Sequence, residues 1–554
     1  MDVDDQVLNA EQGMPSRRTF LKAAASGIGV ACMPLVAGAQ DRQFDYLLKN
    51  GMVIDGTGAP GTRQDVAIRG ERIEAIGSFP DSAAAEVVDL DGATLCPGFI
   101  DVHAHTNLAR ENGAESKLFQ GVTLDITGPD GGSDFPNRKP GSPDAISDAS
   151  QCSSLDAWAR KHDEHGLPMN LGSYVGHATV RELVLGSEQR APSPSELQTM
   201  QDLVRQGMEQ GAVGLSSGLE YNPAGFAETD EVIALAKVAA EFGGVYGTHV
   251  RNEDLLVIES VEEAIEICRK SGATLLLTHL KVAGEPNWDK IERVLELIEQ
   301  ARDEGLDVVA DRYPYLAWST GLSIFFPGWS KEGGTFRDRV KDPDTRVRMK
   351  EETVTNVVAN GGWGALMLTG GLGESFQHLM GKRIDEVAEE AGQDPYDFTC
   401  DLLAENNVRI VGFGMSDENT DRIVSLPYCM IASDGSALTA RPDALGHPRS
   451  FGCFPRAVRQ YVFEKQLMPL HELIRKMTSL PADTMNIPDR GRIEVGKIAD
   501  LVVFRPEDFQ DRATYVKPQQ YSEGVDHLLC NGKFVIKNGK LTGQRPGQIV
   551  TSSR

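Results

Sequence analysis

The sequence predicts an α/β protein in which a (β/α)8 TIM-like barrel is inserted into a small β-sandwich domain formed by the N- and C-terminal segments. Between residues 96 and 485, short apolar runs alternate with segments of helical periodicity, which is typical of βα units and a parallel sheet. Strand-like runs broken by glycine precede this region at 43–95 and return after it at 486–550. A middle region of roughly 390 residues is too long for a common open sheet and suits a barrel with insertions.

Residues 1–39 have the features of an export signal. Arg17 and Arg18 precede a weakly apolar stretch from Ala23 to Ala37, and the small-residue pattern ends at Ala39. This segment resembles a twin-arginine signal cleaved after Ala39, so we expect the twin-arginine export machinery as a partner and a periplasmic or secreted protein. An apolar run below about 18 residues is too short to span a membrane, which argues against an integral membrane protein.

Both ends of the mature chain predict short strands. The N-terminal part, from Asp45 to about Asp91, has alternating apolar runs such as Val66-Ala67-Ile68. The C-terminal part has similar runs, Ile493-Glu494-Val495, Leu501–Phe504 and Phe534–Ile536, and the turn dipeptides Asn531-Gly532 and Asn538-Gly539. Two half-sheets at opposite ends of one chain predict a single β domain that both termini complete.

The middle of the chain, residues 96–485, predicts the barrel. Five segments carry apolar residues at the i, i+3, i+4 spacing of helices: Ser195–Gly211, Thr229–Phe242, Val257–Ser271, Trp288–Gly305 and Arg383–Gly392. Between some of them lie strand-like runs, for example Thr274–Leu277 and Val308–Ala310. The stretch 325–348 is rich in glycine, proline and charge, and predicts an inserted lid loop.

Charge and cysteine content exclude several classes of function. Lys plus Arg number 55 against 81 Asp plus Glu, which gives a formal net charge of −26. Nucleic-acid and anionic-membrane binders need a basic surface, so the sequence argues against both. The seven cysteines after residue 39 show no clustered spacing, which argues against a structural zinc knot or a disulfide framework.

Metal-competent side chains follow several of the predicted barrel strands. His103 and His105 stand at i and i+2, which places both imidazoles on one face of a strand. His249, His279 and Asp434 each follow a further apolar run. Barrel enzymes keep their active sites at the carboxyl ends of the strands, so we expect these groups to meet there. Imidazoles with a carboxylate suit Zn²⁺, and we predict one or two zinc ions.

These residues also carry a family resemblance. Pro97–His105, with the preceding Gly51–Gly58, resembles the opening of the amidohydrolase superfamily. Further segments resemble the D-aminoacylase (N-acyl-D-amino-acid deacylase) family, from residue 43 to 550: Ser216–Pro223, Thr248–Glu253, Thr278–Lys281, Asp311–Tyr315, Ser433–Gly435, His447–Arg449, Ala499–Phe504 and Thr542–Gly547. The resemblance implies a zinc-dependent hydrolase that cleaves the amide bond of N-acyl-D-amino acids.

The resemblance also implies a role for each of these residues. His249 and His279 hold the tightly bound zinc, and His103 and His105 line a second, weaker site. Asp434 acts as general base on a metal-activated water and returns the proton to the leaving amine. In the same way, the resemblance implies that Lys281, Tyr313 and Arg449 bind the carboxylate of the N-acyl amino acid substrate.

The sequence departs from the family pattern at one metal-binding position. The family commonly has a cysteine in the loop after Gly-Val-Thr, and this chain has Asp130 there. A carboxylate can still bind or bridge metals, although it is a harder ligand than a thiolate and can change the preferred ion or the number bound. Asp125, from the same stretch, is a second candidate that we expect to be structural. We expect Glu220 to belong to a substrate loop or to support the ligands.

Two other functions remain open from the sequence. A cyclic-amide hydrolase of the dihydroorotase or hydantoinase kind uses the same scaffold, but it usually carries a carboxylated barrel lysine. No lysine stands at a strand end between His105 and His249. A non-catalytic metal-dependent binding protein is the other alternative, and the intact set of histidines with Asp434 argues against it.

Overall fold

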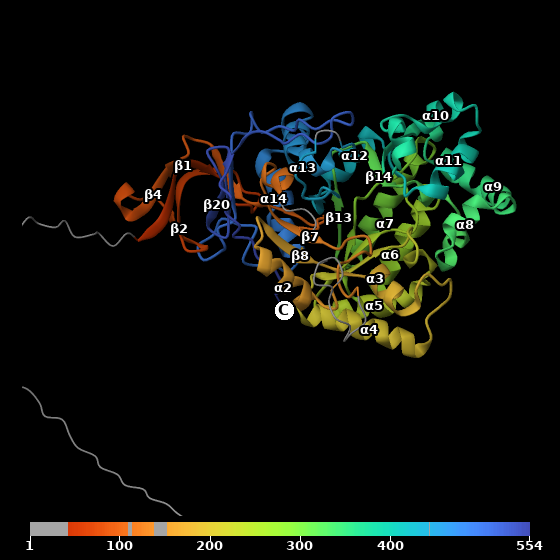
Figure 1. Cartoon of the computed structure of the whole chain (residues 1–554). Helices are drawn as coiled ribbons and strands as arrows, with labels where there is room; N and C mark the ends of the chain where they lie inside the picture. Colours follow the sequence, from red (N-terminus) through yellow and green to blue (C-terminus); the bar gives the residue numbers. More distant parts are fainter. Residues whose placement is uncertain (1–42, 109–112, 138–151, 442–443, 554) are drawn as a thin grey trace, which may run out of the picture. The chain divides into compact units, whose positions relative to one another are not determined.

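The computed structural model describes residues 43–108, 113–137, 152–441 and 444–553 (Figure 1). The predicted export signal and its cleavage point lie outside these residues. Within them, no helix combines the length and the apolar character that crossing a membrane requires.

The two ends of the described chain form one nine-stranded sheet (Figure 1). Its order is β21-β20-β19-β18-β5-β1-β2-β3, with β4 beside β1. The N- and C-terminal halves join where β5 pairs with β18 in antiparallel register, Leu95 opposite Val503. The strands are β1 Phe44–Val53, β2 Thr62–Arg69, β3 Arg72–Gly77, β4 Ala84–Asp89, β5 Thr94–Pro97, β18 Leu501–Phe504, β19 Val525–Cys530, β20 Lys533–Lys537 and β21 Lys540–Leu541.

Both halves of this sheet share one apolar core. Leu48 and Val66 from the N-terminal half are buried in the same cluster as Leu501 and Phe534 from the C-terminal half. A strand is also predicted at 493–495, and this prediction is wrong. Residues 493–495 lie between two glycines with positive φ, Gly491 and Gly496, and form a loop that enters a turn at 495.

Eight parallel strands form the barrel. One sheet contains β6 Phe99–Asp101, β7 Val122–Thr127 and β8 Asn170–Ser173, and the other contains β9 Val175–Gly176, β10 Gly214–Gly218, β11 Val245–His249, β12 Thr274–Leu277, β13 Val308–Arg312 and β17 Cys429–Ile431. Only Tyr174 separates β8 from β9, so these two are parts of one strand. A parallel bridge between Ala104 and Gly435 joins the segments after β6 and β17, and closes the ring.

Four of the five predicted helices belong to the barrel: α4 Pro194–Glu209, α5 Thr229–Ala240, α6 Val257–Ser271 and α7 Ile291–Asp303, each followed by a barrel strand (Figure 1). Local sequence signals fix their ends: Ser193 and Glu196 form a capping box at the start of α4, and Gly272 in the left-handed region ends α6. Each helix buries an apolar stripe against the strands, as Val261 and Ile265 of α6 do. The fifth, predicted over Arg383–Gly392, is present as α10 Ile384–Glu390 but belongs to the insertion between β13 and β17 and not to the barrel.

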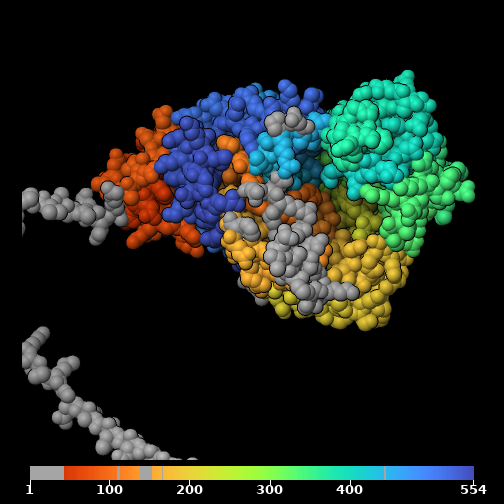
Figure 2. Space-filling model, viewed as in Figure 1, coloured from red at the N-terminus to blue at the C-terminus, as the bar shows by residue number. Residues whose placement is uncertain are grey.

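An insertion lies between β13 and β17. It contains a three-stranded antiparallel sheet, β14 Ala317–Gly321, β15 Leu366–Gly370 and β16 Arg409–Phe413, in the order β14-β16-β15. Its α-helices are α8 Phe336–Lys341, α9 Pro343–Ala359, α10 Ile384–Glu390 and α11 Pro395–Glu405, and α12 Asp417–Ser425 follows β16 and leads into β17. In the space-filling view the insertion, coloured green to cyan, gathers into one lobe (Figure 2).

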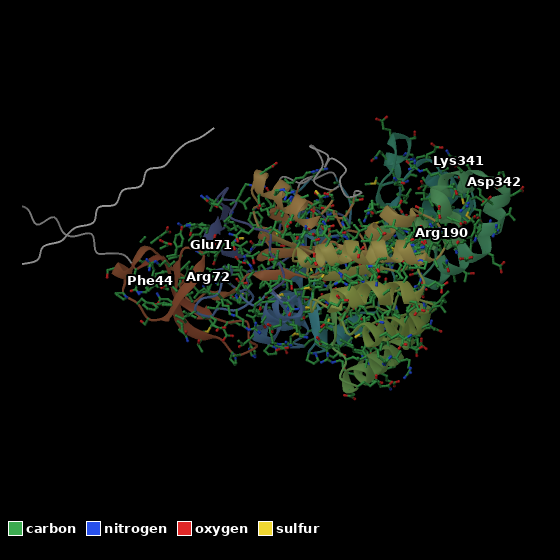
Figure 3. All side chains as sticks on the ribbon, turned by 90° about the horizontal axis from the view of Figure 1, so that it is seen from below. Phe44, Glu71, Arg72, Arg190, Lys341 and Asp342 are labelled. Carbon is green, nitrogen blue, oxygen red and sulfur yellow. The ribbon has the colours of Figure 1, made fainter. Side chains whose placement is uncertain are left out.

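The predicted lid loop at 325–348 is largely helical and belongs to this insertion. It contains the 3₁₀ segment η5 Gly328–Gly334, all of α8 and the start of α9. Lys341 and Asp342, labelled in Figure 3, mark the junction of the two helices. The Asp342 carboxylate caps α9 by accepting a hydrogen bond from the backbone N–H of Thr345, and Pro343 occupies the first turn.

Candidate metal centre

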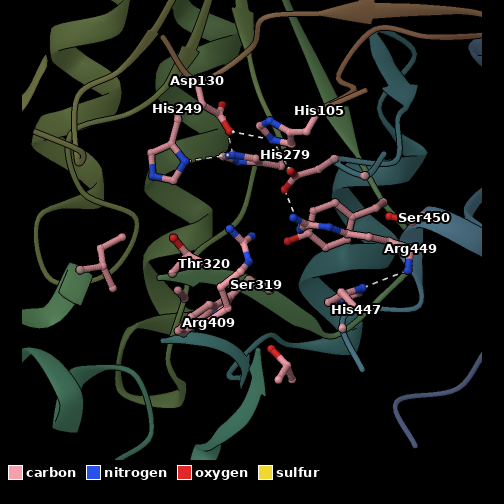
Figure 4. Close-up of a pocket in the computed structure, with 18 of the residues that line it drawn as sticks. His105, Asp130, His249, His279, Ser319, Thr320, Arg409, His447, Arg449 and Ser450 are labelled. Carbon is pink, nitrogen blue, oxygen red and sulfur yellow. Dashed lines mark hydrogen bonds and ion pairs between the residues drawn. The ribbon is translucent and has the colours of Figure 1, made fainter. Parts of the chain in front are cut away.

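Six metal-competent side chains meet at the carboxyl ends of the barrel strands. We call them the metal cluster: His103, His105, Asp130, His249, His279 and Asp434. They follow or end β6, β7, β11, β12 and β17. All but His103 line a cavity of about 760 Å³, and Figure 4 shows several of them around it. The barrel therefore brings together residues that lie up to 331 positions apart in the sequence.

Asp130 links two possible metal sites. His103, His105, Asp130 and Asp434 form one group of potential ligands, and Asp130, His249 and His279 form another, with the donor atoms of each group within 4.8 Å of one another. Asp130 Oδ2 lies 3.3 Å from His103 Nε2, and Asp130 Oδ1 lies 3.7 Å from His279 Nε2. A carboxylate whose two oxygens face different histidines is suited to bridge two ions.

The metal cluster carries the signature of a cation-binding site. His103 Nδ1, Asp130 Oδ1 and Asp311 Oδ2 are buried without hydrogen-bond partners among the described residues, and such atoms are costly to leave unsatisfied. Burial opposes protonation of His103, but the carboxylates of Asp130, Asp434 and Asp311 outweigh it and raise the pKa of this imidazole. The local field thus attracts positive charge, and imidazole with carboxylate ligands fits zinc.

Three members of the metal cluster have an unusual backbone conformation. Asp130 has a φ of 53°, His279 of 36° and Asp434 of 49°, which lie in the left-handed region. Residues other than glycine adopt this region at a cost of order 1–3 kcal/mol each. The packing of the surrounding barrel offsets this cost and keeps the three residues in this conformation.

Three carboxylates that the sequence analysis did not place among the metal residues hold the histidines in position. Glu220 Oε2 lies 2.7 Å from His249 Nε2. This direct contact fits a role in supporting the metal ligands better than a role in a substrate loop. Glu253 Oε1 lies 3.1 Å from His279 Nδ1, and Asp311 accepts a hydrogen bond from the backbone N–H of His279 at 2.8 Å. Carboxylates of this kind orient ligating imidazoles and raise their basicity.

The three residues predicted to bind the substrate carboxylate, Arg449, Tyr313 and Lys281, differ in their contacts. Arg449 Nη1 lies 2.6 Å from Asp434 Oδ2, and its guanidinium lies 5.1 Å from the Tyr313 ring. The Tyr313 hydroxyl lines the cavity and is buried without a partner among the described residues, so it is available to a ligand oxygen. Lys281 also lines the cavity, but its ammonium donates to Glu253 at 2.5 Å and lies 2.7 Å from His279 Nδ1.

The charge state of Asp434 follows from its neighbours. Burial raises the pKa of this carboxyl, but Arg449, His103 and His105 outweigh burial and hold the pKa well below its usual range. Asp434 is therefore ionised, as a general base must be at neutral pH.

A second buried ionic group lies behind the metal cluster. We call it the support cluster: Asp101, Lys117 and Asp125. Lys117, in α1 Glu115–Leu118, donates to the Asp101 carboxylate and, at 2.8 Å, to the Ser433 hydroxyl. Asp101 in turn accepts from the backbone N–H groups of His103 and Ser433 at 3.2 and 3.0 Å. The support cluster thus ties together the backbone segments that carry His103 and Asp434. Asp125 lies 3.3 Å from the Lys117 ammonium and accepts a hydrogen bond from the Thr106 hydroxyl at 2.5 Å, contacts that fit a structural role.

A closed parallel barrel with imidazole and carboxylate donors at the carboxyl ends of its strands defines a metal-dependent barrel enzyme. Comparison with known proteins narrows this class. The amidohydrolase family matches residues 86–314 and 429–536, so the inserted segment falls between the two matched parts. The chain belongs to the amidohydrolase family.

Its relatives within the family include deacylases. D-aminoacylase of Alcaligenes xylosoxydans xylosoxydans is 34% identical over 519 residues, covering 92% of this chain and 98% of the relative. N-acyl-D-glutamate deacylase of the same organism is 33% identical over 514 residues, covering 92% of this chain and 96% of the relative. The crystal structure of N-acyl-D-glutamate deacylase from Bordetella bronchiseptica, complexed with zinc and a phosphonate inhibitor, superposes with a TM-score of 0.78 at 31% identity, covering 92% of this chain and all of that one.

Proposed function

We propose that the protein is a zinc-dependent hydrolase that cleaves the amide bond of N-acyl-D-amino acids to a carboxylate and a free D-amino acid. The observation that carries this proposal is the arrangement of the metal cluster: two potential metal sites share Asp130, and Asp434 lies between them and the guanidinium of Arg449. Relatives of similar length are deacylases of D-amino-acid derivatives, which supports the same substrate class.

The metal cluster would hold one or two zinc ions. Zinc lowers the pKa of a water molecule toward 7 and polarises the amide carbonyl. Asp434 is ionised and lies 3.0 Å from His105 Nε2, so it is positioned to accept the proton of the attacking water. The same carboxyl would then donate this proton to the leaving amine nitrogen. Glu220 and Glu253 would hold His249 and His279 in place during these steps.

Arg449 and Tyr313 would bind the α-carboxylate of the substrate. Both line the cavity beside Asp434, and the Tyr313 hydroxyl is buried without a partner in the described part of the chain. A guanidinium can bind a carboxylate through two hydrogen bonds. Lys281 would contribute positive charge, while its ammonium remains bound to Glu253 and His279.

A hydrolysis screen tests the proposal. Purified protein of known metal content is incubated with N-acetyl-D-amino acids, their L enantiomers and cyclic amides such as dihydroorotate and hydantoins. We expect turnover of D substrates, loss of at least about 100-fold in kcat for Asp434→Asn, and retention of zinc by that variant. Turnover of L substrates or cyclic amides alone would contradict the proposal. Substrate binding without turnover in either form would indicate a binding protein.

We also propose that the twin-arginine machinery exports the protein to the periplasm or medium, because Arg17 and Arg18 precede a short apolar stretch that is followed by a small-residue cleavage pattern ending at Ala39. Replacement of both arginines by lysine should retain the protein in the cytoplasm, as cell fractionation measures. Export of that variant at the wild-type level would contradict the proposal.

A further inference from the structure

The cavity contains a cationic side chain that the proposed mechanism does not use. Arg409 is the first residue of β16 and lines the cavity that the metal cluster occupies. In Figure 4 it lies with Ser319 and Thr320 on the side of the cavity away from His249 and His279. It belongs to the inserted segment, outside the two parts of the chain that match the amidohydrolase family.

Arg409 makes no ion pair with any residue in the described part of the chain. Three cavity-lining residues there are lysine or arginine, and two of them are already paired: Lys281 with Glu253, and Arg449 with Asp434. The Arg409 guanidinium makes no hydrogen bond or ion pair to a described residue, although the chain carries a formal net charge of −26. Arg409 is exposed toward the cavity, and partial desolvation together with the nearby Arg449 lowers the pKa of its guanidinium, although Tyr221 and Asp434 oppose the shift. An anion in the cavity would therefore stabilise its charged form.

Strands β14 and β15 surround Arg409 with small and hydroxyl-bearing residues. Gly321 of β14 and Gly370 of β15 stand opposite Arg409 in the antiparallel ladder, which leaves its side chain unobstructed by its direct neighbours. Ser319 and Thr320 line the cavity from β14, and the Thr320 hydroxyl donates to the Tyr221 hydroxyl at 3.2 Å. A free guanidinium beside hydroxyl groups is a receptor for a carboxylate.

We propose that Arg409 binds a second carboxylate of the substrate, so that the preferred substrates are N-acyl-D-amino acids with two carboxylates. Arg449 and Tyr313 would bind the α-carboxylate, and Arg409 the other. The second carboxylate belongs either to the amino-acid side chain or to the acyl group. This inference rests on the proposed function and names the substrate class within it.

The test compares substrates that differ only in charge. N-acetyl-D-glutamate is paired with N-acetyl-D-glutamine, and N-succinyl-D-methionine with its neutral succinamoyl counterpart. We expect the charged member of one pair to have a kcat/KM roughly 10- to 100-fold higher, since a charge-assisted hydrogen bond contributes that much. The pair that shows the preference identifies which part of the substrate carries the second carboxylate.

Variants connect this preference to Arg409. In Arg409→Met the ratio of charged to neutral substrate should fall to about 1, and in Arg409→Lys part of the preference should remain because the charge is kept. Arg337→Met is the matched control. Arg337 also belongs to the insertion and is exposed like Arg409, but it does not line the cavity and it donates to Asn407 at 3.0 Å. This control should keep the wild-type ratio.

The outcomes separate this inference from the proposed function. Hydrolysis of N-acyl-D-amino acids without a charge preference, or with a preference that Arg409→Met leaves intact, would overturn the role of Arg409 alone. If no such substrate is hydrolysed, the proposed function fails, and calorimetric titration with glutarate then tests the site directly. Glutarate should bind the wild type at least 10-fold more tightly than Arg409→Met; equal affinities would overturn the inference.

Discussion

The metal cluster, which is partly open to the cavity, and the support cluster, which is fully buried, are groups of ionisable side chains at the same end of the barrel, but they differ in how their charges are balanced. The support cluster contains its own cation: the Lys117 ammonium lies between the carboxylates of Asp101 and Asp125. Burial lowers the pKa of Lys117, but these two carboxylates outweigh burial and raise it. The support cluster is therefore complete without any ligand.

The metal cluster, by comparison, has no lysine or arginine among its members. Asp130 and Asp434 face four imidazoles, and Asp130 Oδ1 and His103 Nδ1 have no hydrogen-bond partners among the described residues. The pKa of the His105 imidazole is raised although burial opposes its protonation, because Asp130 and Asp434 attract positive charge. The difference indicates that the support cluster balances its own charges and stabilises the fold, whereas the donor set of the metal cluster is suited to bind a cation. It can be tested by removing one charge from each.

The largest effect is expected from Asp130→Ala, which removes a donor from both potential metal sites. We expect the zinc content to fall and kcat/KM for the best N-acyl-D-amino acid to drop at least about 100-fold, because metal activation is worth several kcal/mol. Zinc analysis and steady-state kinetics measure both quantities. Asp130→Cys is the matched control, since a thiolate is also a zinc ligand and should retain metal. Full zinc content and turnover in Asp130→Ala would show that Asp130 is not a ligand.

The sequence predicts the metal cluster because each member follows a recognisable strand. His103 and His105 share a strand-like spacing, while His249, His279 and Asp434 end or follow apolar runs that form β11, β12 and β17. Asp130 is identified by its place after Gly-Val-Thr. The strand assignments alone then predict that these residues meet, because all parallel strands of a barrel have their carboxyl ends at the same mouth.

Residues outside this pattern are not predictable in the same way. Glu253 lies four positions after His249 in a loop, and nothing in its local sequence directs its carboxylate to His279. Arg409 is the first residue of the central strand of the inserted sheet, and only the pairing of β16 with β14 and β15 brings it into the cavity. The helices of 325–348 were predictable in part, since Asp342-Pro343 is a helix-start signal that the glycine and charge content of the stretch obscures.

A smaller but still large effect is expected in the support cluster. Lys117→Met leaves Asp101 and Asp125 buried without their cation, which typically destabilises a protein by about 3–5 kcal/mol. Urea unfolding of purified protein measures the free energy of unfolding. The control is Lys382→Met, whose exposed ion pair with Glu390 should contribute less than about 1 kcal/mol. If Lys117→Met and Lys382→Met have similar stability, the support cluster does not stabilise the barrel in the way described.

The smallest effect concerns Lys331, a lysine that contrasts with Lys117 because no carboxylate contacts it in the described part of the chain. It lies in η5, its ammonium is 3.4 Å from the Ile324 carbonyl oxygen, and burial lowers its pKa to about 8 although Glu220 and Glu352 oppose the shift. The unfolded chain, with a lysine pKa near 10.5, therefore binds more protons than the folded protein between about pH 8 and 10.5, so this residue makes stability rise with pH in that window. In Lys331→Met that contribution, on the order of 1 kcal/mol, should be absent. We expect the urea midpoint of the wild type to rise relative to that of Lys331→Met between about pH 7.5 and pH 10. A difference between the two midpoints that stays constant across this range would show that Lys331 is ordinarily solvated.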